Sequence, residues 1–335
     1  MSLAWTDLAA IPDEVAPANN YWDSSTLVGY AGKLYAYNID QLCIYDVASD
    51  TWSAGTIPDI SMIGNAAAVV VDGVIWYVNY QGYVQTYTIA TGEWSDMVNW
   101  PGDGATSGRG VPSASHIAGK IYLYVRGAFL AFDIETQTRT LTSFSRGNTT
   151  YRSSVTDGTK LYGVEGYQGN WSDVGLQPSS QSDTGVLETY NPSTDTWTYS
   201  ENPDPQYRND HVAVFHGGNI YAICGGSDDN NYPGGYSVPW VSVYNISGDS
   251  WTVDTDLAIP RADAVACVLN DKIYVLGGYS NGGAEPDPEH SLVVAALAGG
   301  GDDGGGGGGP PVLIDPDLRL GSDVAPRNVH YMPVR

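Results

Sequence analysis

Basic residues are scarce in this sequence. Lysine and arginine total 14 against 38 acidic residues, which gives a formal net charge of −24. A chain this acidic repels the phosphate backbone of nucleic acids, so we expect no DNA or RNA partner. The acidity is compatible with plain solubility or a saline habitat, and alternatively with divalent cations or a basic partner surface.

Cysteine and long apolar runs are also rare. Cys43, Cys224 and Cys267 are the only cysteines, and each lies in an apolar stretch, so we expect buried thiols and neither a disulfide framework nor a metal site. No apolar run approaches the length of a membrane span. The opening "MSLAWTDLAAIPDE" lacks the pattern of a conventional secretory signal, although a signal that was removed is an alternative.

Leucine-rich helical stretches are missing, whereas glycine (41), tyrosine (24) and tryptophan (10) are abundant. This composition favours strands and turns. A length of 335 residues would hold one large β domain or two ordinary ones.

One segment recurs along the chain. "YNPSTDTW" at 190–197 has copies in "YDVASDTW", "YTIATGEW" and "YNISGDSW", with a fainter copy, "FDIETQTR", that ends in arginine. The spacing between copies is 42 to 58 residues, which is typical of propeller blades. Counting one further match near the start, the final position of the segment is occupied by Trp5, Trp52, Trp94, Arg139, Trp197 and Trp251.

A second marker runs in step with the first. A tight turn followed by an apolar–aromatic strand occurs six times, as in "GKLYAY" and "DKIYVLGG". Together the markers predict four strands per copy in a β-meander. The last copy lacks its tryptophan strand, and "AWTDLAAIP" near the N-terminus resembles the missing piece. We therefore predict an all-β, six-bladed propeller whose sixth blade is completed by the N-terminal strand, with tryptophans packed between blades.

The chain resembles the kelch-repeat β-propellers. Residues 270–280, "NDKIYVLGGYS", match the kelch pattern closely, with Arg261 upstream. Residues 218–226, "GNIYAICGG", match as well, together with Arg208, Tyr190 and Trp197. The resemblance extends over about residues 3–297, but the Gly-Gly pair is absent from the first four copies.

The resemblance implies that first strands line a central channel and that the strand 4–1 and strand 2–3 connections share one face. The strand 2–3 connections are long in blades four (165–185), five (225–240) and six (277–290). Their aromatic residues suit stacking on sugar rings or contact with a protein surface, or else they cover the blade edges. These residues are Tyr167, Trp171, Tyr232, Tyr236 and Trp240.

Charged residues precede the first strands on the same face. Their arginines could bind a ligand carboxylate, or alternatively form ion pairs with aspartates across blades. The residues are Arg109, Arg152, Arg208, Asp210, His211, Arg261 and Asp263.

Catalytic and metal signatures are weak. The five histidines show no metal-ligand spacing, no cysteine matches the copper-oxidase propellers, and we expect no cofactor. "SDDNN" at 227–231 carries possible Ca²⁺ ligands without EF-hand spacing. An enzyme that modifies sugars in the channel, such as a sialic-acid isomerase or an oxidase, is the alternative to a binding module.

The chain divides into three parts: a propeller at 1–298, a glycine-rich linker at 299–309 and an extended peptide at 310–335. The peptide is either disordered or adds to the surface of another protein. Our interpretation is a non-enzymatic protein- or glycan-binding propeller, attached through residues 310–335 to a larger assembly such as a virion or an extracellular surface structure.

Overall fold

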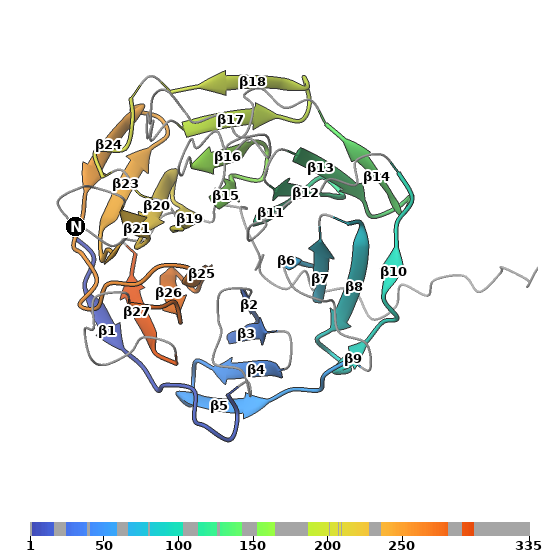
Figure 1. The fold of residues 1–335 in the computed structure, drawn as a ribbon, viewed down its shortest axis with the longest axis horizontal. Coiled ribbons are helices and arrows are strands. Elements are labelled where there is room, and N and C mark those ends of the chain that lie inside the picture. Colours follow the sequence, from blue (N-terminus) through green and yellow to red (C-terminus); the bar gives the residue numbers. More distant parts are fainter. Residues whose placement is uncertain are drawn as a thin grey trace, which may run out of the picture.

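Six antiparallel sheets form a closed ring in the computed structural model (Figure 1). It describes residues 2–16, 25–38, 41–58, 66–79, 81–102, 113–125, 128–142, 153–164, 187–200, 202–206, 208, 210–227, 236–280 and 290–297. The predicted linker 299–309 and peptide 310–335 lie outside these residues.

Each blade is one sheet of the ring. The strands of blade 1 are β2 (Thr26–Tyr30), β3 (Lys33–Asn38), β4 (Gln41–Asp46) and β5 (Thr51–Ala54). Those of blade 2 are β6 (Ala66–Val71), β7 (Val74–Asn79), β8 (Tyr83–Thr88), β9 (Glu93–Trp94) and β10 (Val98–Asn99). Those of blade 3 are β11 (Ser113–Ile117), β12 (Lys120–Val125), β13 (Ala128–Asp133) and β14 (Thr138–Leu141).

The remaining blades complete the predicted number of six. The first strands of neighbouring blades contact one another all the way round, from β2 through β25 and back to β2. The strands of blades 4 to 6 are β15 (Ser153–Thr156), β16 (Leu161–Val164), β17 (Leu187–Asn191) and β18 (Thr196–Tyr199); β19 (Val212–His216), β20 (Asn219–Ile223), β23 (Val241–Asn245) and β24 (Ser250–Val253), with the small β21 (Gly226–Ser227) and β22 (Tyr236–Ser237); and β25 (Val265–Leu269), β26 (Lys272–Leu276), β27 (Leu292–Ala296) and β1 (Trp5–Asp7).

The ring closes as predicted, with a strand from each end of the propeller in one sheet. β1 pairs antiparallel with β27, and Trp5 lies opposite Ala295. The backbone N–H of Leu8 then donates to Leu292 O at 2.9 Å, which extends the pairing beyond the strand. Closure removes the open edges that an incomplete array of sheets would leave.

The core lies between blades, because side chains on a strand alternate between its two faces. In β12, Ile121 and Leu123 join the apolar cluster shared with blade 2, whereas Tyr122 and Tyr124 join the cluster shared with blade 4. All four are buried. A blade is therefore apolar on both faces, which explains the aromatic and β-branched character of the strand 2 repeats.

The recurring tryptophans pack between blades, as predicted. The ring of Trp94 lies 5.1 Å from that of Tyr87 in its own blade and 5.1 Å from that of Tyr37 in blade 1. The indole N–H also donates to a carbonyl just after the fourth strand of the preceding blade, which ties consecutive outer strands together. These bonds are Trp5 to Thr255 O (3.0 Å), Trp52 to Ala9 O (2.8 Å), Trp94 to Thr56 O (2.8 Å) and Trp251 to Asn202 O (3.1 Å).

The cysteines are free thiols in the structure. Cys43 and Cys224 are buried and Cys267 is half-buried. Burial raises the pKa of each of the three thiols to about 12, so all of them are protonated at neutral pH. Among the described residues, no helix has the length and hydropathy that crossing a membrane would require.

Candidate functional site

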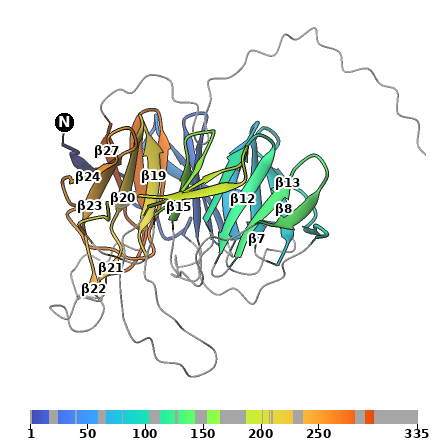
Figure 2. The same ribbon diagram turned by 90° about the horizontal axis from the view of Figure 1, so that it is seen from above.

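The strand 2–3 connections of blades 5 and 6 form the best-defined part of one face. In blade 5, β21 and β22 pair as a small hairpin that projects from the body of the ring (Figure 2). Its base lies at Gly225 and Val238, where the Val238 N–H donates to Gly225 O at 2.7 Å. The structure thus builds a defined stem beneath the long connection expected from the sequence.

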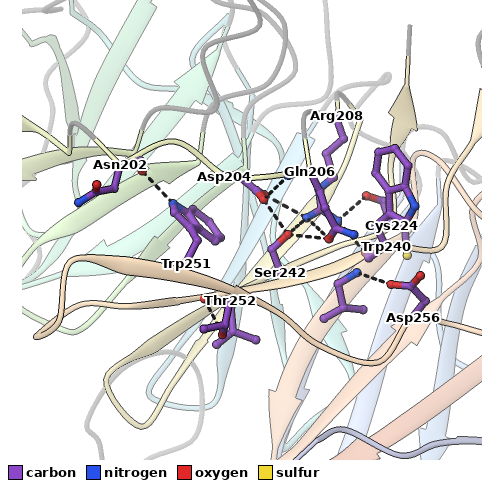
Figure 3. Close-up of polar contacts among 12 residues, drawn as sticks. Asn202, Asp204, Gln206, Arg208, Cys224, Trp240, Ser242, Trp251, Thr252 and Asp256 are labelled. Carbon is purple, nitrogen blue, oxygen red and sulfur yellow. Dashed lines mark hydrogen bonds and ion pairs between the residues drawn. The ribbon is translucent and has the colours of Figure 1, made fainter. Parts of the chain in front are cut away.

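Arg208 holds the base of this connection from inside the blade (Figure 3). Its side chain is only 2% exposed. The Nη1 group donates to Trp240 O at 2.6 Å and to Cys224 O at 3.4 Å. Cys224 follows β20 and Trp240 precedes β23, so one guanidinium joins the two ends of the connection.

A buried carboxylate balances the charge of Arg208. Asp204 lies in the connection between blades 4 and 5. Its Oδ2 accepts a hydrogen bond from Arg208 Nη2 at a distance of 3.0 Å. Ser242 on β23 accepts a bond from the same nitrogen and donates to Asp204 Oδ1 at 2.8 Å. Because a buried charge is costly without a partner, this network fixes the position of the arginine.

Arg261 joins the two ends of the strand 2–3 connection of blade 6 in the same way, and no carboxylate among the described residues bonds to it. It is fully buried, and its Nη1 donates to Gly277 O at 3.1 Å and to Ser291 O at 3.5 Å. The Nη2 group donates to Ser291 Oγ at 3.0 Å. Leu257 occupies the position four residues before Arg261, where blade 5 has Asp204. Burial lowers the pKa of Arg261 from its ordinary value.

The two clamped connections are also bonded to each other. The Gly225 N–H donates to Arg261 O at 2.9 Å, and Ser237 Oγ donates to Tyr279 O at 2.8 Å. The second glycine of the Gly-Gly pair, Gly278, is required by the backbone. Its φ is +86°, and a Cβ there would lie 2.7 Å from the carbonyl oxygen of Ala262. Blades 5 and 6 therefore share one continuous platform at this face.

Two aspartates lie beside the platform at the start of the inner strands. Asp210 and Asp263 are half-buried, with φ values of +50° and +53°. Asp263 donates its backbone N–H to Asp210 O at 3.0 Å, so the two residues are adjacent around the ring. Aspartate tolerates this left-handed conformation better than most residues do.

His211 is a further buried titratable group of the site. It is 7% exposed, and within the described part of the chain neither ring nitrogen has a hydrogen-bond partner. Burial, and secondarily the charge of Arg208, lowers its pKa to about 3. The ring is therefore neutral at physiological pH.

The structure brings together six of the residues singled out in the sequence, namely Arg208, Asp210, His211, Arg261, Asp263 and Trp240. The guanidiniums of Arg208 and Arg261 are turned into the blades, and the half-buried Trp240 contributes its carbonyl to the clamp. The side chain of Tyr236 on β22 lies outside the described set. Whole residues outside it are Arg109, Arg152, Tyr167, Trp171 and Tyr232.

Sequence reasoning missed Asp204, Ser242 and Ser291. Asp204 lies four residues before Arg208, but "ENPDPQYRND" also offers Asp210, and distance along the chain does not distinguish the two. Of the predicted calcium segment 227–231, only the backbone of Ser227 is described. No group of three or more His, Cys, Asp or Glu side chains capable of holding a metal occurs among the described residues.

Comparisons with known proteins agree with this architecture. The kelch motif matches residues 260–290, from just before Arg261 to just before β27. The chain is 24% identical over 285 residues to Kelch-like protein terF of Aspergillus terreus, covering 78% of this chain and 59% of that protein. It is 30% identical over 122 residues to F-box/kelch-repeat protein SKIP30 of Arabidopsis thaliana, covering 32% of this chain and 34% of the relative.

The fold has a counterpart among solved structures. The structure of YjhT superposes with a TM-score of 0.63 at 15% identity, covering 86% of this chain and 96% of that one. Identity at this level shows the fold alone. The motif match, the kelch relatives and the six blades together confirm the resemblance, and the chain is a kelch-type β-propeller.

Proposed function

We propose that this propeller is a non-enzymatic protein-binding module that uses the face carrying the strand 2–3 connections of blades 5 and 6. One observation carries the proposal: buried arginines clamp the ends of both long connections, and the two clamped stems are bonded to each other. Loops held on a rigid scaffold are the usual place for recognition, because little ordering is left to occur on binding.

The arrangement of the arginines also bears on the alternative of a sugar-modifying enzyme. Such an enzyme would need guanidiniums directed at an acidic substrate in the channel. Arg208 and Arg261 instead donate to main-chain carbonyls at the loop stems. This use of both side chains favours a scaffolding role and supports the binding module.

Site-specific photo-crosslinking tests the binding face. A photo-reactive amino acid at Ser280, beside the blade 6 stem, is expected to capture the partner from the native source. The matched control is the same amino acid at the exposed Thr136, in the strand 3–4 turn of blade 3. Equal capture at both positions, or capture at Thr136 alone, would place the binding surface elsewhere and overturn the proposal.

A second part of the proposal concerns the C-terminal peptide and the attachment of the propeller to a larger assembly. Residues 310–335, beyond the glycine-rich linker, are proposed to hold the propeller on a multi-subunit particle such as a virion or a surface structure, with a glycan as the alternative ligand of the loop face. A chain ending at residue 298 should fold and separate from the particle. Copurification of the shortened chain with the particle would contradict attachment through the peptide.

A further inference from the structure

The outer junction of blades 2 and 3 departs from the other junctions. Arg139 on β14 occupies the position that tryptophan holds in the other blades, and it pairs with Phe132 where those blades have mostly tyrosine. The arginine is nonetheless 7% exposed. A long charged side chain has therefore been taken into the rim of the ring.

Two glycines make room for this arginine. A Cβ on Gly82, whose φ is +91°, would clash with Arg139 Nη1. A Cβ on Gly102, whose φ is +148°, would clash with the carbonyl oxygen of Arg139. The Arg139 N–H donates to Pro101 O at 3.0 Å, which fixes the backbone against the preceding connection. The guanidinium thus lies in a cradle that any other residue at Gly82 would fill.

The guanidinium in this cradle has unused donors. Within the described part of the chain, Arg139 Nε and Nη1 are buried without a hydrogen-bond partner, and no ion pair joins Arg139 to a carboxylate. Arg208, with a similar degree of burial, has a carboxylate, a hydroxyl and two carbonyls around it. Because burying a charged group without acceptors is costly, the cradle calls for an acceptor, and an anion supplies one that also compensates the charge.

We propose that Arg139, in the cradle formed with Gly82, is a binding site for a small oxyanion such as a carboxylate or phosphate. A planar guanidinium presents its N–H groups in forks that match two oxygens of such an anion. The site lies on β14, the fourth strand of blade 3 at the outer rim, where Leu141 is 51% exposed, so it is separate from the proposed loop face of blades 5 and 6. A free anion and a carboxylate on a partner protein share this chemistry.

Thermal unfolding of the full chain tests the site. Phosphate, sulfate or acetate is titrated against chloride at constant ionic strength and pH. The wild type is expected to show a melting temperature that rises and saturates with the oxyanion, because binding to the folded state alone stabilises it. Arg139→Met should lose this rise, and Lys272→Met, which removes an exposed cation, should keep it. An equal rise in Arg139→Met, or no rise in the wild type, would overturn the proposal.

A second measurement covers the case in which Arg139→Met does not fold. In wild-type protein with labelled arginine side chains, the Nε–H resonance of Arg139 should shift progressively as the oxyanion is added. A resonance that stays unchanged would mean that the chain itself saturates the guanidinium, and the proposal would fall. A synthetic acidic peptide, titrated in the same way, separates the two sources: a shift with the peptide alone identifies a partner carboxylate, and a shift with inorganic phosphate identifies a free anion.

Discussion

The junction between blades 4 and 5 and the junction between blades 2 and 3 meet the same packing requirement with different residues. At the first, Trp251 packs 5.2 Å from Tyr244 and donates to Asn202 O of the preceding connection. At the second, the repeat position holds Arg139, and the buried Trp100 from the preceding connection packs 6.1 Å from Phe132. The requirement is for an indole between consecutive outer strands, and either strand four or the connection before it supplies one.

The two junctions also differ in whether a carboxylate compensates the charge of a buried arginine. Arg208 is neutralised by Asp204, whereas Arg139 lies in its glycine cradle with no described acid beside it. Each difference can be tested by substitution, and the variants are given from the largest expected loss in the free energy of unfolding to the smallest. Equilibrium unfolding in urea gives the free energy of unfolding for all of these variants.

Trp100→Ala should have the largest effect. Trp100 is 3% exposed and touches Trp76 as well as Phe132, so truncation leaves a large cavity between blades 2 and 3. We expect a loss of about 4 kcal/mol, as for other large aromatic residues cut to alanine in a core. A loss below about 1 kcal/mol would show that Trp100 does not replace the missing repeat tryptophan.

Arg208→Ala should follow, with a loss of about 3 kcal/mol, because it leaves the Asp204 carboxylate buried without its partner. Asp204→Leu is the matched control, since it copies the Leu257 that accompanies Arg261 in blade 6. This control should lower the free energy of unfolding by less, because in blade 6 the described partners of Arg261 are carbonyls and a hydroxyl only. The reverse order would mean that the aspartate, and not the clamp, stabilises the loop stem.

Gly102→Ala should cost about 2 kcal/mol, because its Cβ would strike the Arg139 backbone and φ is positive. Gly82→Ala is the informative comparison. Its Cβ would meet the end of the Arg139 side chain, which can move, so its cost should be smaller and should fall further in an Arg139→Met background. Equal costs for Gly82→Ala in both backgrounds would show that the guanidinium does not occupy the cradle.

His211 should make the blade 5 junction sensitive to acid. Its pKa is lowered from 6.5 to about 3 in the folded state, so between these values the unfolded chain binds a proton that the folded chain does not. Stability contributed by the neutral ring is complete above pH 6.5 and declines as the pH falls, by about 1.4 kcal/mol per pH unit. His211→Gln should flatten this slope, and parallel pH profiles for the variant and the wild type would contradict the assignment.

Trp251→Phe should have the smallest effect, a loss of about 1 kcal/mol, since an aromatic ring still packs on Tyr244 while the hydrogen bond to Asn202 O and part of the ring are removed. The comparison with Trp100→Ala measures how unevenly the two junctions depend on their indoles. A loss as large as that of Trp100→Ala would mean that a phenyl ring cannot replace the indole at this junction.

The blade count and the ring closure were predictable because they depend on periodic residues. Trp5, Trp52 and Trp197 recur at blade spacing, and a sheet needs a partner for its last strand. Trp100 was not predictable as a replacement, because it lies outside the repeat position. Its role depends on the connection running from β10 to the edge of β14, where Gly102 bridges to Arg139.

The arginines near the channel were located by the sequence, but their environment was not. Arg208 contacts Cys224 and Trp240, which follow it by 16 and 32 residues, and only the folded blade brings these carbonyls together. Arg and Asp residues at these positions give the same sequence pattern whether the arginine is exposed to a ligand or is buried and bonded to main-chain carbonyls. The ligand-binding role assigned to these residues stays a prediction, while their structural contacts are established.

The pairing of β1 with β27 has a consequence for biosynthesis. β1 and β27 lie at opposite ends of the propeller, so β1 can pair only after the rest of the propeller has been synthesised, and the ring cannot close before then. Until then Trp5 lacks the strand beside which it packs, and a nascent or truncated chain should depend on chaperones far more than the complete propeller.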